Sequence, residues 1–243
     1  MALISAEKDP MGQAIADYYR TGEAKRLRVI SSMFDEDEIP VSTLFRGAEQ
    51  MNAMERTALD AVYGRILDVG AGSGCHSLVL QERGHSVTAI DVSPLSVETM
   101  RKRGVEDARL ADFYEMECDT RYDTLLMLMN GSGSIGTLQG MERFFDRLDR
   151  ILAPGGQVLM DSSDLRYVYE DEEGEMDWNP EWGYYGEVDY RMQYGRVKGE
   201  PFDWLYVDLE TLKRYAEENG YCVTLLALGE HYDYLAQLKR KVI

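Results

Sequence analysis

Residues suited to binding a nucleotide lie in one short loop and at one acid farther along the chain. The loop follows the mostly apolar run 66–69, and glycine alternates in it with small residues: Gly70, Ala71, Gly72, Ser73 and Gly74. Because glycine has no Cβ, the backbone can turn sharply there and can approach a ligand closely. Asp91 ends a second apolar run about 20 residues after the first glycine, the spacing of an acid that accepts hydrogen bonds from ribose hydroxyls. The pattern predicts a nucleotide-binding corner made of a strand, a glycine turn and a helix N-terminus.

Asp68, inside the first predicted strand, separates two interpretations of this corner. A dinucleotide site has the pattern G-x-G-x-x-G, whereas position 75 is cysteine here and the glycines follow G-x-G-x-G. A carboxylate at Asp68 would repel a pyrophosphate but would suit a nearby ammonium group. A nicotinamide-dependent oxidoreductase is therefore the less favoured interpretation.

Residues 68–74, Asp-Val-Gly-Ala-Gly-Ser-Gly, resemble motif I of the class I S-adenosylmethionine-dependent methyltransferases, and Asp91 matches the ribose-binding acid of that family. The resemblance extends through three further segments, 111–113, 123–130 and 153–156, and reaches the strand that ends at Asp161. It implies S-adenosylmethionine as the cofactor. It also implies an α/β Rossmann-like, doubly wound sheet of seven strands, mostly parallel, with an antiparallel last strand and helices on both faces. The resemblance is specific for the cofactor and says nothing about the methyl acceptor.

The resemblance places the cofactor at the carboxyl ends of the predicted strands. The residues expected to bind it are Asp68, Gly70, Ala71, Gly72, Ser73, Gly74, His76, Asp91, Val92, Asp112, Phe113, Asn130 and Gly131. Asp91 would accept from both ribose hydroxyls, and Asp112 with Phe113 matches the adenine-contact position of the family. His76 is expected to meet the cofactor through its backbone, and Asn130 to contact the methionine moiety or the acceptor.

No general base can be identified from the sequence, and the weak candidates for catalytic contacts are Asn130, Asp161 and His231. Methyl transfer from a sulfonium is an in-line displacement, so the protein needs chiefly to align the reactants and exclude water. The three histidines are not at metal-ligand spacing, and we predict no metal. Asn130 is followed by Gly-Ser-Gly, not by the Pro-Pro-aromatic signature of amino-group methylation of nucleic-acid bases.

Composition narrows the choice of partners. The chain has 243 residues, of which 44% are hydrophobic, and a formal net charge of −18. The length and hydrophobic content predict one packed domain with an additional lobe. Because nucleic acids and anionic membranes are themselves negatively charged, the charge disfavours both as partners. We expect a small-molecule acceptor, and the sequence leaves open whether the protein is a monomer or a homodimer.

Cysteine usage and hydropathy favour a cytoplasmic location. The three cysteines are widely spaced and odd in number, which predicts neither a disulfide framework nor a zinc site: Cys75, Cys118 and Cys222. Residues 1–10 lack a basic start followed by a long apolar run, so no secretory signal is visible. The longest apolar run, 125–129, is too short to span a bilayer.

Residues 64–243 are predicted to form the cofactor-binding domain. Strand and helix patterns alternate up to residue 161, which predicts a parallel sheet with right-handed crossovers. The expected strands are 66–69, 87–91, 108–110, 122–129 and 158–160, and the expected helices are 76–83, 94–103 and 138–152. Residues 130–136 read as a flexible polar loop, and 209–219 as a helix followed by an antiparallel hairpin over 221–238.

Two segments outside this alternation are candidates to cover the acceptor. Residues 1–63 predict a helical lid, with helices at 11–20 and 50–63 and a solvated turn at the acidic run 35–38. The candidate acceptor contacts are Tyr18, Tyr19 and Arg46 in this lid and Asp164 after the fifth strand. Residues 162–207 predict an inserted β-ribbon, because apolar and polar residues alternate from 184 to 194. Its many Tyr and Trp residues would form either the core of the ribbon or an aromatic cage for a cationic acceptor.

The sequence thus predicts a small-molecule methyltransferase. A protein that binds S-adenosylmethionine or its demethylated product without catalysis would have the same cofactor motif. Turnover with any acceptor would distinguish the two.

Overall fold

A central sheet of seven strands has the order β11-β12-β7-β6-β3-β4-β5 in the computed structural model, which describes residues 2–117, 120–171 and 173–241. The strands are β3 (Arg65–Val69), β4 (Ser86–Asp91), β5 (Asp107–Leu110), β6 (Tyr122–Met127), β7 (Leu152–Ser163), β11 (Tyr221–Leu228) and β12 (Asp233–Arg240). Strands β3 to β7 pair in parallel, and β12 runs antiparallel to both of its neighbours. The predicted Rossmann-like sheet with an antiparallel last strand is confirmed.

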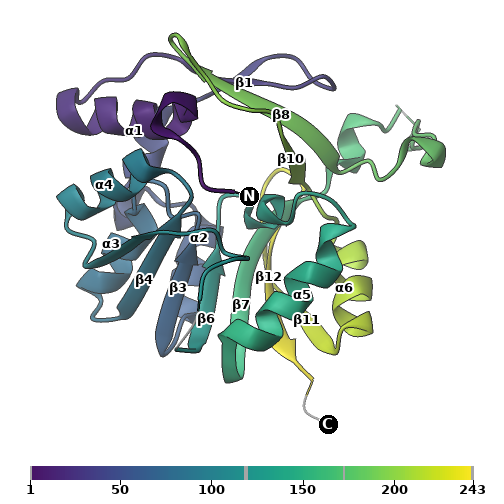
Figure 1. Cartoon of the computed structure of the whole chain (residues 1–243). Coiled ribbons are helices and arrows are strands. Elements are labelled where there is room, and N and C mark those ends of the chain that lie inside the picture. The colour runs from purple at the N-terminus through teal and green to yellow at the C-terminus, as the bar shows by residue number, and fades with distance from the viewer. Residues whose placement is uncertain (1, 118–119, 172, 242–243) are drawn as a thin grey trace.

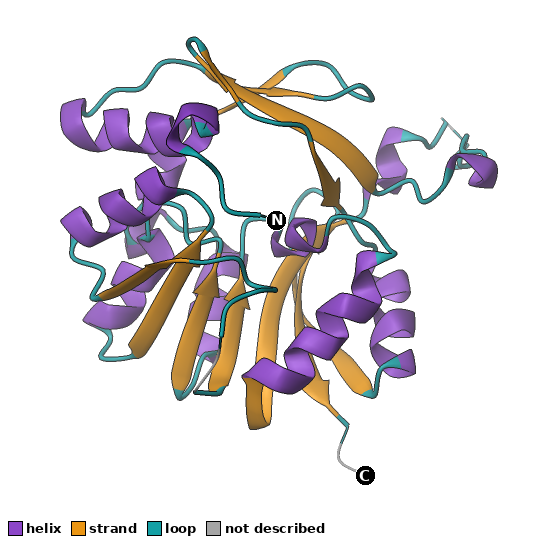
Figure 2. Cartoon of the chain, viewed as in Figure 1, coloured by secondary structure: helices purple, strands orange, loops and turns teal. Residues whose placement is uncertain are grey.

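Five helices cover the two faces of this sheet (Figures 1 and 2). They are α2 (Ala53–Ala61), α3 (Cys75–Glu82), α4 (Pro94–Arg103), α5 (Gly140–Ile151) and α6 (Leu209–Glu218). Strand side chains alternate between the faces, so Leu67 packs with Phe144 of α5 whereas its neighbour Ile66 packs with Leu80 of α3. Each face of the sheet therefore buries its own apolar layer. The twelve-residue α1 (Pro10–Thr21) lies outside these layers and packs on α4.

The turn from β3 into α3 requires glycine at its last position. Gly74 has a φ of +81°, which side-chain-bearing residues rarely adopt. A Cβ atom at Gly74 would also lie 2.7 Å from Cγ2 of Val105. The end of the loop is therefore held close to the segment that follows α4.

A second sheet joins two segments that lie far apart in the sequence. Its strands are β1 (Leu27–Ile30), β2 (Asp37–Ile39), β8 (Glu187–Tyr194), β9 (Val197–Lys198) and β10 (Phe202–Leu205). The order is β10-β8-β1-β2, with β9 paired to β8. The inserted ribbon at 162–207 is thus extended by two strands from the N-terminal segment. Figure 1 shows this second sheet above the carboxyl ends of the central strands.

Two local expectations differ from the structure. Residues 1–63 are not helical throughout, because they contribute β1 and β2, and the acidic run expected to be a turn leads into β2. Residues 130–136 are not a flexible polar loop, because 131–135 form the short helix η4 (Gly131–Ile135). Ser132 within it is fully buried, and its Oγ donates to the carbonyl of Leu205 at 2.8 Å. Hydrogen bonding to the second sheet orders this polar segment.

In the part of the chain that the structure describes, no helix has the length and apolar composition needed to cross a membrane. Cys75 and Cys222 are free thiols, and Cys118 lies outside the described residues.

Candidate functional site

The glycine turn is fixed to the end of β4 by backbone hydrogen bonds. The amides of Gly70 and Ala71 donate to the carbonyl of Ile90 at 2.9 and 3.0 Å. The amide of Gly72, at a φ of +57°, donates to Oδ2 of Asp91 at 2.8 Å. The two features that the sequence placed about 20 residues apart are therefore in direct contact.

The carboxylate of Asp91 keeps capacity for further hydrogen bonds. Its Oδ1 accepts from the amide of Ser93 at 2.8 Å, and each oxygen has a second lone pair. Burial, with smaller contributions from the nearby charges of Asp9 and Asp68, raises the pKa of Asp91 to about 6 against the opposing effect of the two backbone hydrogen bonds. An ionised Asp91 can accept hydrogen bonds from two hydroxyl groups of a ligand.

A cavity beside Asp91 brings five of the predicted cofactor residues together. Its walls are formed by Val69, Gly70, Ile90, Asp91, Val92, Ala111, Asp112, Phe113, Tyr114 and Ser134. Phe113 is buried, and Oδ1 of Asp112 accepts from the amide of Tyr114 at 2.9 Å. This arrangement suits a flat heteroaromatic ring, because apolar atoms from β4 and from the segment after β5 lie beside a carboxylate.

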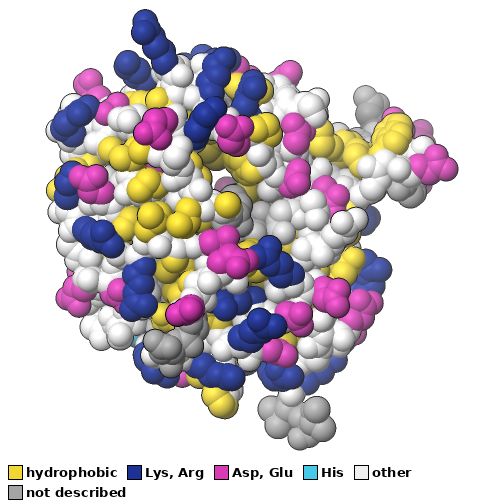
Figure 3. Space-filling view, viewed as in Figure 1, with side chains coloured by type: hydrophobic (Ala, Val, Ile, Leu, Met, Phe, Trp, Pro, Cys, Tyr) yellow, Lys and Arg dark blue, Asp and Glu magenta, His cyan; other side chains and the backbone are white. Residues whose placement is uncertain are grey.

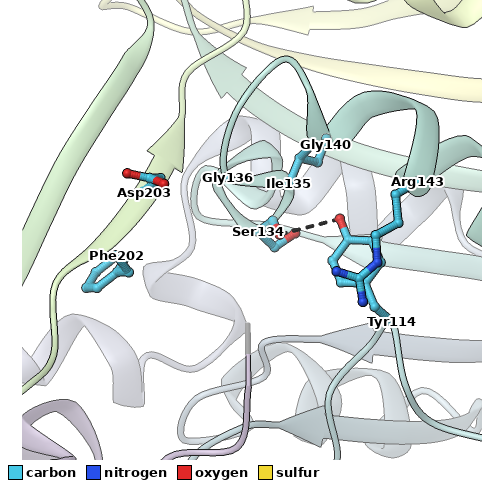
Figure 4. A pocket seen from close by; sticks show the side chains of 8 residues that line it. All are labelled: Tyr114, Ser134, Ile135, Gly136, Gly140, Arg143, Phe202 and Asp203. Carbon is cyan, nitrogen blue, oxygen red and sulfur yellow. Dashed lines mark hydrogen bonds between the residues drawn. The ribbon is translucent and has the colours of Figure 1, made fainter.

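A second cavity, of about 220 Å³, shares Tyr114 and Ser134 with the first (Figure 4). Figure 4 shows Phe202 and Asp203 of β10 on the side opposite Tyr114 and Arg143. The hydroxyl of Tyr114 points at the carbonyl of Ser134, 3.5 Å away, and the guanidinium of Arg143 lies 4.3 Å from the centre of the Tyr114 ring. Sequence reasoning missed Tyr114 and Ser134, although Tyr114 directly follows the predicted adenine position.

A buried network of charges lies next to the glycine turn. Nε2 of His76 lies 2.8 Å from Oε1 of Glu55, and the guanidinium of Arg46 pairs with the same carboxylate. Burial alone would lower the pKa of His76, but interactions with Cys75, Glu55 and Asp68 raise it well above its usual value. Burial likewise opposes the ionisation of Glu55, yet His76, a backbone amide and Arg46 lower its pKa to about 2.

The structure gives Arg46 and His76 a shared side-chain partner. The side chains of both residues point at Glu55, which the sequence analysis did not single out. Asp68 is also buried, and its Oδ2 accepts from the hydroxyl of Ser77 at 2.6 Å. Burial raises the pKa of Asp68. The acceptor contact of Arg46 and the cofactor contact of His76 stay predictions.

Asn130 adopts an unusual backbone conformation at the end of β6. Met129 and Asn130 have φ values of +65° and +60°, and both polar atoms of the Asn130 side chain are buried without a hydrogen-bond partner in the described structure. The next amide, that of Gly131, donates to Oδ1 of Asp161 at 3.0 Å. Such strained positions cluster at functional sites, and the unpaired amide makes Asn130 a candidate ligand-binding residue.

The remaining candidates have separate surroundings. Tyr18 packs on Phe45 with ring centres 4.7 Å apart, whereas the hydroxyl of Tyr19 donates to the carbonyl of Lys102 on α4. Asp164 accepts from the hydroxyl of Tyr185 at 2.8 Å. His231 is exposed in the turn between β11 and β12.

Asp9 is a second residue that sequence reasoning missed. Its carboxylate accepts from the amide of Gly12 at 2.8 Å and from the hydroxyl of Ser93 at 2.5 Å. It therefore caps α1 and ties that helix to the N-terminus of α4, beside Asp91. A proline after an acid is a common helix start, so Asp9-Pro10 contained the signal for the cap but not for the contact with Ser93.

Comparisons with known proteins agree with this geometry. A methyltransferase-domain family model matches residues 67–160. A Bacteroides fragilis S-adenosylmethionine-dependent methyltransferase, solved in complex with S-adenosylhomocysteine, is 56% identical to this chain. The match covers 99% of this chain and 98% of that one, with a TM-score of 0.93.

Two curated proteins are more distant. The cypemycin N-terminal methyltransferase of a Streptomyces species is 29% identical over 109 residues, which are 41% of this chain and 42% of that protein. The demethylmenaquinone methyltransferase of Clavibacter sepedonicus is 30% identical over 152 residues, 58% of this chain and 60% of that protein. The matched region thus spans about half the length of these curated relatives.

Proposed function

Since the chain belongs to the class I S-adenosylmethionine-dependent methyltransferases, we propose that it transfers a methyl group from S-adenosylmethionine to a small-molecule acceptor. The observation that carries this proposal is the contact between the glycine turn and Asp91. The overall likeness to a methyltransferase that was solved with S-adenosylhomocysteine supports it. The nicotinamide-dependent alternative has no comparable support.

Buried polar atoms without partners fit the cofactor's methionine end. Both polar atoms of the Asn130 side chain and Nε of Arg46 are buried and lack partners in the described structure. An unsatisfied buried group costs about 1–3 kcal/mol. The zwitterionic methionine end of the cofactor would supply a carboxylate for Arg46 and an ammonium group for the side-chain oxygen of Asn130. Asp68 would add a negative charge near the ammonium group.

The other cofactor contacts follow from the cavity beside Asp91. Asp91 would accept from the ribose hydroxyls, and Asp112 from the adenine amino group. Phe113 would lie against the adenine ring, and Gly70 and Gly72 would let the backbone approach the methionine end. These roles are proposals that rest on position in the fold and on the family resemblance.

When bound, the cofactor supplies a methyl group that its sulfonium charge makes electrophilic. The chain's own residues then need to hold this group in line with the acceptor atom and keep water away. In this proposal the backbone at 129–131 would form the floor of the site, and the second sheet, which lies above the carboxyl ends of the central strands, would cover it. We assign no general base.

A small-molecule acceptor fits the cover over the site. Figure 3 shows the surface hollowed beneath the second sheet, with hydrophobic side chains near the opening. A covered site limits the size of the acceptor, and the net charge of −18 disfavours a polyanion. The oligomeric state and a cytoplasmic location stay predictions.

Calorimetric titration with S-adenosylhomocysteine tests the proposal first. We expect saturable binding of one molecule per chain, with a dissociation constant well below a millimolar. Incubation with methyl-labelled S-adenosylmethionine and a metabolite panel should then yield a labelled product. No binding at millimolar concentration would refute the proposal, and binding without any labelled product would favour a non-catalytic sensor.

A further inference from the structure

The inner face of the second sheet can be identified from its strand register. Met192 on β8 pairs with Val29 on β1, and Val29 pairs with Asp37 on β2. Directly paired residues point to the same face of a sheet. Met192 packs with Ile15 of α1 below the sheet, so Asp37 also faces inward, toward the central sheet.

Asp37 differs from both of its acidic neighbours. Glu36 pairs with Arg28, and Glu38 pairs with Arg26, in ion pairs near the outer surface of the sheet. Asp37 makes no ion pair with a Lys, Arg or His residue among the described residues, and its Oδ1 accepts only the amide of Glu38, at 2.7 Å. Asp37 is exposed, so the inner face presents to solvent a carboxylate with no cationic partner from the described part of the chain.

A hydrogen-bonded pair of tyrosine hydroxyl groups lies on the same side of the second sheet as this carboxylate. Tyr190 and Tyr206 share a hydrogen bond with an oxygen–oxygen distance of 3.1 Å. Burial raises the pKa of both hydroxyl groups, and the charge of Asp37 is a smaller cause in the same direction. Tyr190 lies two residues from Met192 on β8, so its side chain points to the same face as Asp37. The hydroxyl of Tyr169 is buried and has no hydrogen-bond partner in the described structure. Burial raises its pKa, and the nearby Tyr190 adds to this effect.

The tyrosine pair lies at the reacting end of the central sheet. Tyr206 is flanked by Leu205, whose carbonyl accepts from Ser132, and by Val207, whose amide donates to Oγ of Ser162 at 2.9 Å. Ser132 follows β6, and Ser162 lies near the end of β7, where Asn130 and Asp161 also lie. The backbone on either side of Tyr206 is therefore tied to the end of the central sheet where the methyl group is proposed to lie.

From this arrangement we propose that the acceptor is an amine, recognised by Asp37 and by the hydroxyl groups of Tyr190 and Tyr206. The proposal rests on the methyltransferase function proposed above. An unpartnered carboxylate favours a ligand that carries a positive charge or gains one, and tyrosine rings favour the same kind of ligand. Asp37 is exposed to solvent, so its carboxylate would attract a cationic acceptor without requiring one, whereas it would repel an acidic acceptor.

The reaction moves the positive charge toward Asp37. The lone pair of the neutral amine nitrogen forms the new N–C bond to the methyl group, while the electron pair of the breaking C–S bond stays on sulfur. Sulfur becomes a neutral thioether and nitrogen becomes a methylammonium ion, which afterwards releases its proton to water. Asp37 would stabilise the charge that develops on nitrogen during the transfer.

Matched pairs of acceptors test this assignment. Each pair has one carbon skeleton with either an amino or a hydroxyl group: 2-phenylethylamine and 2-phenylethanol, glucosamine and glucose, putrescine and 1,4-butanediol. With labelled S-adenosylmethionine, we expect transfer to at least one amine and to none of the alcohols. Transfer to an alcohol instead, or to no amine by a protein that binds S-adenosylhomocysteine, would overturn the amine assignment.

Two variants examine the role of Asp37. We expect D37N to lower kcat/KM for the reactive amine about tenfold or more and to leave the affinity for S-adenosylhomocysteine unchanged. The matched control E38Q changes the next acid on the same strand, which faces outward, and should keep full activity. Equal kcat/KM in D37N and E38Q would overturn the proposal. If the unmodified protein does not bind S-adenosylhomocysteine, the methyltransferase function itself is refuted.

Discussion

Replacing Asp91 by asparagine should weaken cofactor binding and remove its pH dependence. Each oxygen of Asp91 accepts one backbone amide at 2.8 Å and would accept one ribose hydroxyl. A hydrogen bond to a charged group contributes roughly 1.5–3 kcal/mol. The asparagine side chain would be neutral, and its amino group would face a backbone donor from either Gly72 or Ser93. We expect a dissociation constant for S-adenosylhomocysteine about 10- to 100-fold higher at pH 7.5.

The pH dependence follows from the pKa of Asp91, which burial raises from 3.8 to about 6. At pH 5 such a group is ionised in roughly one molecule in ten. If the ribose hydroxyls need the ionised form, the affinity of the unmodified protein should fall about tenfold between pH 7.5 and pH 5. The D91N variant should show nearly the same affinity at both values.

Weaker binding at pH 5 could not be explained by protonation of Asp91 destabilising the folded protein. Because the pKa is raised in the folded protein, the folded state holds a proton that the unfolded state has released between about pH 4 and pH 6. The contribution of Asp91 to stability therefore increases as the pH falls through this range, by up to about 3 kcal/mol.

Calorimetry at the two pH values is the assay, with D60N, a change at an exposed acid on α2, as the control. A dissociation constant of the unmodified protein that stays constant from pH 7.5 to pH 5 would refute the pH argument. Unchanged affinity of folded D91N at pH 7.5 would refute the assignment of the ribose contact itself.

Three further outcomes follow from buried contacts. Glu55→Gln removes the carboxylate shared by Arg46 and His76 and should cost about 3–5 kcal/mol of stability, so an unchanged urea midpoint would contradict the ion network. Because the pKa of Glu55 is lowered from 4.5 to about 2, its stabilising effect is complete above about pH 5 and is lost toward pH 2. The urea midpoints of the unmodified protein and the variant should therefore converge as the pH is lowered from 5 to 2. Gly133→Ala would place a Cβ atom 1.8 Å from the Trp204 ring and so shift β10. It should lower acceptor turnover about tenfold, with a smaller effect on S-adenosylhomocysteine affinity. Equal effects on turnover and affinity would contradict the idea that the contact between Gly133 and Trp204 positions the acceptor.

The central sheet and the cofactor corner could be predicted because their signals are local. The strand, the glycine turn and the helix that follows lie within residues 65–82, and Asp91 ends the very next strand. Strand direction follows from the alternation of strands and helices, since short loops and right-handed crossovers leave few topologies. The helix bounds at 94–103 agree with the prediction because Ser93-Pro94 and Gly104 mark its ends.

The second sheet could not be predicted in full, because β1 pairs with β8 across more than 150 residues of sequence. Leu27 lies opposite Tyr194, and nothing in the short segment 27–30 specifies that partner. An isolated pair of short strands is marginally stable, so β1 and β2 depend on β8 for their formation. The N-terminal segment therefore reads as helices and turns when it is considered alone.

The sequence by itself determined the nucleotide-binding corner, because the spacing of its glycines and Asp91 specifies a local shape, and the resemblance of residues 68–74 to a known motif implied the fold family and the cofactor. Only the tertiary structure decided which polar groups have partners. Glu55 meets His76, and Asp37 faces inward without a counter-ion among the described residues, because of packing and strand register between distant segments. One residue of register shift would turn Asp37 outward, and no local pattern in the sequence sets that register.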